Sequence, residues 1–144
     1  MKSTLLIISL CIIGLFTNSC SKDDVNEGLI ISSININSIS CSPSGTQFII
    51  TNDSLYKNAF GNSTTCSLPA IDFNTYTLLG VYAKGGCNAN FTRNVVRLDA
   101  EMRYHYKVTV KDHGMCKVLT YNYNWVTVPK LPNGWTVTFE VKNK

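Results

Sequence analysis

The segment "RYHYKVTVK" (103–111) decides how this chain folds. Its side chains alternate without a break between an apolar set, Tyr104, Tyr106, Val108 and Val110, and a polar set, His105, Lys107, Thr109 and Lys111. A period of two places the first set on one face of an extended chain and the second set on the other. The segment therefore predicts a β-strand with one buried face.

Neighbouring segments have the same character. Segment 117–128 places Leu119, Tyr121, Tyr123 and Trp125 on one face, and segment 135–142 is expected to turn Trp135, Val137, Phe139 and Val141 inward. Further strand candidates are 46–51, 76–83 and 95–98. Because short turns at 111–116 and 128–134 separate the three long strands, we expect an antiparallel sheet. The predicted fold class is mainly β, a small antiparallel β-sandwich or a partly open barrel.

One short helix is predicted over residues 52–60, "NDSLYKNAF". Asn52 or Asp53 can cap its first free N–H groups, and Gly61 follows its last residue, as glycine often does after a helix. We expect no other helix in the mature chain.

The N-terminus has the features of a secretory signal. Lys2 precedes the apolar run "LLIISLCIIGLF" (5–16), whose twelve residues would rise only about 18 Å as a helix, against roughly 30 Å of bilayer hydrocarbon. A buried core helix is the alternative, but such a helix usually has a polar stripe. We expect residues 1–19 to be removed, residues 20–40 to form a flexible tether that starts with a lipidated cysteine, and residues 41–144 to form a single β-rich domain. At the end of the tether, Ile34, Ile36 and Ile39 alternate with polar residues and could add a short strand.

The stretch "TNSCSKDD" (17–24) gives the signal a more specific meaning. It resembles bacterial lipoprotein signals, which are cut just before a cysteine that carries lipid, and "SKDD" resembles the surface-export signal of Bacteroidota lipoproteins. The resemblance implies that Cys20 is lipidated and that the membrane is a partner through this anchor. It also implies a location on the bacterial outer membrane, exposed at the cell surface. Two or three acyl chains are enough for durable anchoring.

Four cysteines follow Cys20, which in an exported chain indicates two disulfides with three possible connectivities. We favour Cys41–Cys66 and Cys87–Cys116, because each pair brackets a self-contained segment. A Cys₄ zinc site is the alternative, but zinc ligands usually come in close pairs such as CxxC, and these cysteines lie more than twenty residues apart. We expect no metal.

Charge and motifs argue against two classes of function. Without Lys2 the chain has twelve basic and nine acidic residues, with no basic run that would bind nucleic acid. The histidines, His105 and His113, fall on a polar strand face and in a turn, and Asp99 and Glu101 fit a charged turn better than a catalytic pair. No nucleophile or nucleotide motif is present. We expect neither an enzyme nor a cofactor.

Two groups of residues are candidates for binding. The stripe Tyr121, Tyr123 and Trp125 offers aromatic faces of the kind that bind sugars and peptides. The opposite interpretation, that the stripe is core with Trp135 and Phe139 packed beside it, is favoured because Thr120, Asn122 and Asn124 occupy the other face. The second candidate is the proline-stiffened loop 128–134 with Lys130 and the following Trp135.

Residues 66–141 carry a family resemblance, notably "IDF" (71–73), the pair Gly85-Gly86 and the strands that end the chain. They resemble small Bacteroidota lipoproteins of uncharacterised function and, more distantly, the C-terminal domain of the PrcB family, named for a protease-complex subunit. The resemblance implies a non-catalytic interaction module, protease-associated or inhibitor-like, with contacts through loops 83–92 and 128–134. The alternative is an accessory lipoprotein that binds a glycan or small ligand on the aromatic strand face.

Overall fold

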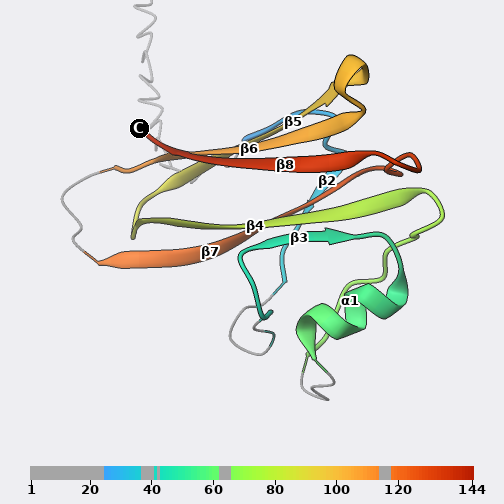
Figure 1. Cartoon of the computed structure of the whole chain (residues 1–144). Coiled ribbons are helices and arrows are strands. Elements are labelled where there is room, and N and C mark those ends of the chain that lie inside the picture. The colour runs from blue at the N-terminus through green and yellow to red at the C-terminus, as the bar shows by residue number, and fades with distance from the viewer. Residues whose placement is uncertain (1–24, 37–40, 42, 62–65, 114–117) are drawn as a thin grey trace, which may run out of the picture.

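The computed structural model describes residues 25–36, 41, 43–61, 66–113 and 118–144 (Figure 1). The predicted signal segment, Cys20 and Cys116 lie outside these ranges.

The described chain forms two four-stranded sheets (Figure 1). Sheet A has the order β1 (Val25–Gly28), β5 (Asn90–Leu98), β6 (Arg103–Lys111), β8 (Thr136–Asn143). Sheet B has the order β2 (Ser32–Ile34), β7 (Leu119–Pro129), β4 (Tyr76–Gly86), β3 (Gln47–Ile50). The elements outside the sheets are the helix α1 (Asp53–Phe60) and a short 3₁₀ turn, Asp99–Glu101. The mainly β prediction is confirmed, and the separate sheets fit the sandwich and not the barrel.

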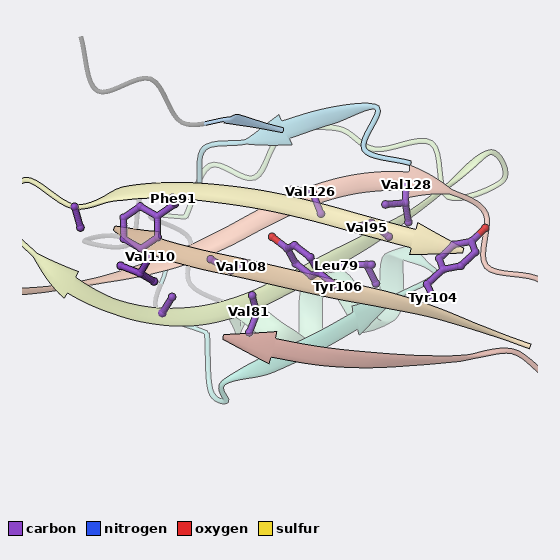
Figure 2. Close-up of a cluster of buried hydrophobic side chains, with 12 residues drawn as sticks. Leu79, Val81, Phe91, Val95, Tyr104, Tyr106, Val108, Val110, Val126 and Val128 are labelled. Atoms are coloured by element: carbon purple, nitrogen blue, oxygen red, sulfur yellow. The ribbon is translucent and has the colours of Figure 1, made fainter. Parts of the chain in front are cut away.

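The apolar face predicted for the opening segment is the centre of the core. Tyr104, Tyr106, Val108 and Val110 of β6 are each at most 1% exposed, and they pack against Leu79 and Val81 of β4 and Val126 and Val128 of β7 (Figure 2). The alternation of β6 therefore buries one side chain in two between the sheets, and the other half faces outward.

The pairing of the long strands differs from the expected antiparallel sheet. β6 and β7 are consecutive but lie in different sheets, and β6 pairs with β8 in parallel, as β1 does with β5. The remaining pairs are antiparallel. Both β6 and β7 supply side chains to the space between the sheets, so they face one another across the core and do not share a ladder.

Part of the expected tether, residues 25–36, contains two strands. β1 and β2 lie within it and pair with the central strands β5 and β7. Gly28 makes the crossing between the sheets possible: its φ is +72°, and a Cβ there would lie 2.2 Å from the Val95 carbonyl oxygen. The folded domain therefore begins before Cys41.

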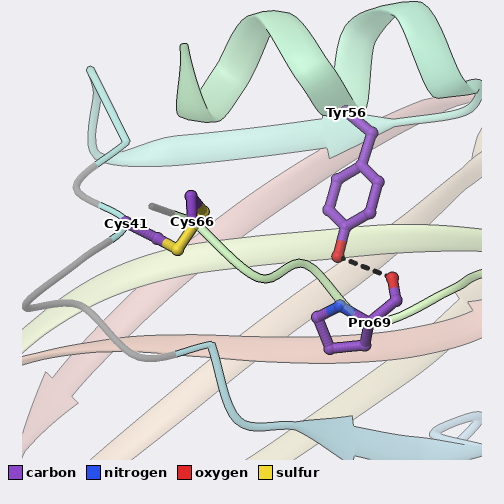
Figure 3. The surroundings of a disulfide bond; sticks show 4 residues. All are labelled: Cys41, Tyr56, Cys66 and Pro69. Atoms are coloured by element: carbon purple, nitrogen blue, oxygen red, sulfur yellow. Dashed lines mark hydrogen bonds between the residues drawn. A yellow bond between two sulfur atoms is a disulfide. The ribbon is translucent and has the colours of Figure 1, made fainter. Parts of the chain in front are cut away.

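Helix α1 covers the outer face of sheet B and makes a third layer (Figure 1). The helix was predicted, and its cap is Asn52, whose side chain accepts a hydrogen bond of 2.8 Å from the Leu55 N–H. The Tyr56 hydroxyl donates to the Pro69 carbonyl oxygen at 3.1 Å (Figure 3). The bond from Tyr56 fastens the helix to the segment that leads into β4.

The Cys41–Cys66 disulfide is present, as predicted, beside the same helix (Figure 3). It joins the chain before β3 to the chain after α1, so the bond encloses the third layer. Cys87 is also disulfide-bonded. The cysteine predicted to pair with it, Cys116, lies outside the described residues.

Three smaller expectations need correction. The strand expected at 95–98 begins at Asn90, and the strand expected at 76–83 continues to Gly86. Val141, expected to point inward, is 41% exposed, because β8 is an edge strand.

Candidate functional site

The aromatic stripe of β7 lies on the outer face of sheet B, on the side of α1. Trp125 is 2% exposed and contacts the rings of Phe48 and Phe60 at centroid distances of 5.1 and 5.2 Å. Its indole occupies the space over Gly80, the residue opposite it on β4. The core interpretation is thus correct for Trp125, but the stripe packs under the helix and not between the sheets.

Towards the other end of β7 the stripe emerges from the core. Tyr123 is half-buried, and its hydroxyl donates to the carbonyl oxygens of Pro43 and Gly45 at 3.2 and 3.0 Å. Tyr121 is 53% exposed. The core interpretation is therefore wrong for Tyr121, because the described side chains that pack around Trp125 under α1 do not include Tyr121.

β4 contributes the other half of this surface. Tyr82 lies opposite Tyr123 in the ladder, and its ring stacks on that of Tyr121 with centroids 5.6 Å apart and planes 14° apart. Lys84 lies opposite Tyr121 and holds its ammonium 5.8 Å from that ring's centroid. We call Tyr82, Lys84, Tyr121 and Tyr123 the tyrosine platform.

The surroundings of the Tyr82 phenol favour its neutral form. Partial desolvation, followed by the neighbouring phenols of Tyr121 and Tyr123, raises the pKa of Tyr82 above its ordinary value. The surface therefore presents hydroxyl donors and ring faces with one cation, Lys84, beside them.

The second predicted candidate group lies elsewhere. Lys130 donates from Nζ to the carbonyl oxygens of Phe73 and Thr51, so it ties the loop after β7 to the chain before β4. Trp135 packs edge-on against Tyr104 and under the Arg97 guanidinium, 4.5 Å from its ring centroid. Neither residue joins the tyrosine platform, and Trp135 and Phe139 pack in the inter-sheet core instead of beside the stripe.

A cleft of about 410 Å³ lies near the β4–β5 turn, between residues of β2, β5 and β7, and its lining includes Tyr123 and Trp125. Arg93 lines it and donates from Nε to Asn124 Oδ1 at 2.9 Å. Asn124 is fully buried, and its carbonyl oxygen accepts from the Tyr106 hydroxyl at 2.9 Å. The polar face predicted for β7 is therefore partly internal. Three lining residues, Cys87, Phe91 and Arg93, each make further interactions.

The ionisable groups considered for catalysis lie on surfaces. His105 contacts Thr138 and Glu140 on the outer face of sheet A, and Asp99 pairs with Arg97. Hydrogen bonds from Lys107, then from His105, hold the pKa of the Glu140 carboxyl below its usual value. Across the described ranges, no three His, Cys, Asp or Glu side chains gather where they could hold a metal ion. Nor does any helix in those ranges have the length and hydropathy to cross a bilayer.

The "IDF" segment has a structural role here. Asp72 accepts hydrogen bonds from the Asn74 N–H at 3.0 Å and the Thr75 hydroxyl at 2.7 Å, which shapes the turn into β4.

Comparison with known proteins finds no family model, no curated protein and no solved structure that matches this chain.

The sequence pattern does not point to Tyr82 and Lys84, because Tyr82 lies within the apolar run 76–83 and Lys84 directly follows it. Only the pairing of β4 with β7 places them beside Tyr121.

Proposed function

We propose that this protein is an exported, lipid-anchored binding module that holds a glycan on its tyrosine platform and performs no catalysis. The observation that carries the proposal is Tyr121, which is 53% exposed while its ring stacks on Tyr82. An exposed aromatic surface on a soluble domain marks a contact site. Tyrosine suits a sugar, because its ring packs against C–H groups and its hydroxyl bonds to the sugar's hydroxyls.

The rigidity of the tyrosine platform supports the proposal. Two long paired strands carry it, and the Tyr123 hydroxyl is fixed by two carbonyl oxygens. Rings that are already held in place lose little conformational entropy when a ligand docks.

A printed array of bacterial and host oligosaccharides tests this function. We expect the purified chain to bind a subset of glycans, Tyr121→Ala to lower that affinity at least about tenfold, and Tyr121→Phe to keep the stacking part of it. Val96→Ala is the control, because Val96 is similarly exposed at 43% but lies on sheet A. Failure to bind any glycan, or unchanged binding by Tyr121→Ala, contradicts the proposal.

The anchor belongs to the same proposal. The lipoprotein-like segment 17–24 supports lipidation of Cys20 and a surface location on the bacterial outer membrane. Mass spectrometry of the mature N-terminus should find a diacylated or triacylated Cys20. Cleavage at another position would refute the anchor.

We also propose that Cys87 pairs with Cys116. Cys41 and Cys66 are already joined to one another, and Cys87 is disulfide-bonded. Non-reducing peptide mapping should recover the Cys87–Cys116 peptide pair, and a free thiol at Cys116 would overturn the assignment.

A protease partner, indicated by the resemblance to the PrcB family, stays a prediction. Of the two segments expected to make that contact, 128–134 is tied to the chain before β4 through Lys130, and most of 83–92 belongs to strands β4 and β5.

A further inference from the structure

β8 is an unusual edge strand. It ends sheet A, and among the described strands only β6 lies beside it. The other three edge strands, β1, β2 and β3, have four, three and four residues, whereas β8 has eight. Proteins usually keep edge strands short, because a long one offers a template for another strand. β8 is therefore the edge of this sandwich best suited to pairing.

Two hydrogen bonds show which backbone groups β8 presents. The Thr136 N–H donates to the Met102 carbonyl oxygen, and the Lys144 N–H donates to that of Val110. Because the register with β6 is unbroken and the ladder has a period of two, the even-numbered residues of β8 bond to β6. The N–H and C=O groups of Val137, Phe139 and Val141 therefore point to the open edge.

Apolar side chains accompany these groups. Val141 is 41% exposed, and Val137 and Phe139 are partly buried against the core. β4 lies against β6 and β8, so β3, the strand beyond β4, is on the same side of the sandwich as β8. Ile49 of β3 is opposite the core residue Leu79 and is 39% exposed. This side of the sandwich is thus incompletely covered.

We propose that the β8 edge binds the β8 edge of a second copy of this chain, antiparallel and about a twofold axis. With Phe139 opposite its own copy, Val137 lies opposite Val141 of the copy, and each of the three opposed pairs exchanges two hydrogen bonds, about six in all. The two sheets A then form one continuous sheet, and the apolar faces of the two β8 strands extend the core.

The charges of β8 favour this register. Glu140 falls opposite Thr138 of the copy and Lys142 falls opposite Thr136, so no like charges oppose one another. Each Glu140 is already paired with Lys107 of its own chain at 3.2 Å. In the neighbouring register, Glu140 would lie opposite Glu140 of the copy, and the repulsion between the two carboxylates makes that register unfavourable.

Sedimentation equilibrium of the purified full chain in density-matched detergent tests the proposal. We expect the mass of two chains, falling to one on dilution. Val141→Lys places a charge at the open edge and should give one chain at every concentration. Val96→Lys is the matched control, since Val96 is 43% exposed on the same sheet but away from the edge. It should leave the two-chain mass unchanged.

Amide hydrogen exchange of the unaltered chain gives an independent reading. The Phe139 and Val141 amides should become protected as concentration rises, while the Thr138 and Glu140 amides are protected throughout. In the sedimentation experiment, a single-chain mass at all concentrations overturns the proposal. A two-chain mass that persists in Val141→Lys, or a dimer that Val96→Lys abolishes equally, also overturns it. In the exchange experiment, Phe139 and Val141 amides whose exchange rates do not change with concentration overturn it.

Discussion

Gly80 and Trp125 meet across the β4–β7 ladder, and the absence of a side chain on one makes room for the other. A Cβ at position 80 would lie 2.1 Å from Trp125 Cζ3. Gly80→Ala should therefore destabilise the fold by about 1–3 kcal/mol, measured by urea unfolding. In a Trp125→Leu background the same change should cost little, because the smaller side chain leaves space. Equal costs in both backgrounds would mean that the indole is not the obstacle.

Asn124 shows how one residue can contradict its pattern. The alternation of side chains along β7 predicts that Asn124 lies on a polar outer face. In the structure Asn124 is fully buried, and its side-chain oxygen accepts a hydrogen bond from Arg93 Nε. Asn124→Ala would leave that donor without this acceptor and should cost about 1–3 kcal/mol in urea unfolding. Asn122→Ala, the same change at an exposed position two residues away, should stay within about 0.5 kcal/mol. Similar losses for the two variants would contradict the buried hydrogen bond.

Helix α1 and the inter-sheet core each bury a tyrosine hydroxyl, so the free energy of unfolding should change with pH in the alkaline range. Burial raises the pKa of Tyr56 to about 12, and burial likewise raises the pKa of Tyr106. Below pH about 10 both the folded and unfolded chains keep these protons, so stability is unaffected. Above it the unfolded chain loses them first, so the free energy of unfolding should fall as pH rises towards 12.

Urea unfolding between pH 9 and about 11.5 measures this decline. Tyr56→Phe should reduce its slope, since phenylalanine does not titrate. Val96→Ala is the control and should leave the slope unchanged, because Val96 has no titrating group and is 43% exposed on sheet A. An equal slope in all three chains would contradict the assignment.

At the scale of elements, local sequence patterns predict which segments form strands or helices better than they predict which strands pair with one another. The period of two in β6 and the cap at Asn52 are local, and both the strand and the helix form as predicted. The parallel pairing of β6 with β8 depends on how the chain after β7 crosses back to sheet A, which no window of sequence contains. For the same reason β1 was missed and β2 was predicted only in part: each has at most four residues, and neighbouring strands stabilise it.

At the scale of the whole molecule, the candidate site was half predicted. Tyr121 and Tyr123 share a strand, so their common face follows from spacing alone. Tyr82 and Lys84 join them only because β4 lies beside β7, and Tyr121 is not among the described side chains that pack around Trp125 under α1. The sequence predicts that Lys130 and Trp135 are free to bind a partner, because they belong to or follow a proline-stiffened loop. In the structure, Lys130 bonds to the Phe73 carbonyl oxygen and Trp135 packs against Tyr104.

The most direct test of the central claim is an NMR titration of the labelled chain with the glycan that binds most tightly on the array. We predict that the largest chemical-shift changes fall on Tyr82, Lys84 and Tyr121, with little change at Val96 and His105 on sheet A. Shifts centred on Ala89 and Arg93, at the far side of the cleft from the tyrosine platform, or spread evenly over both sheets, would contradict binding at the tyrosine platform.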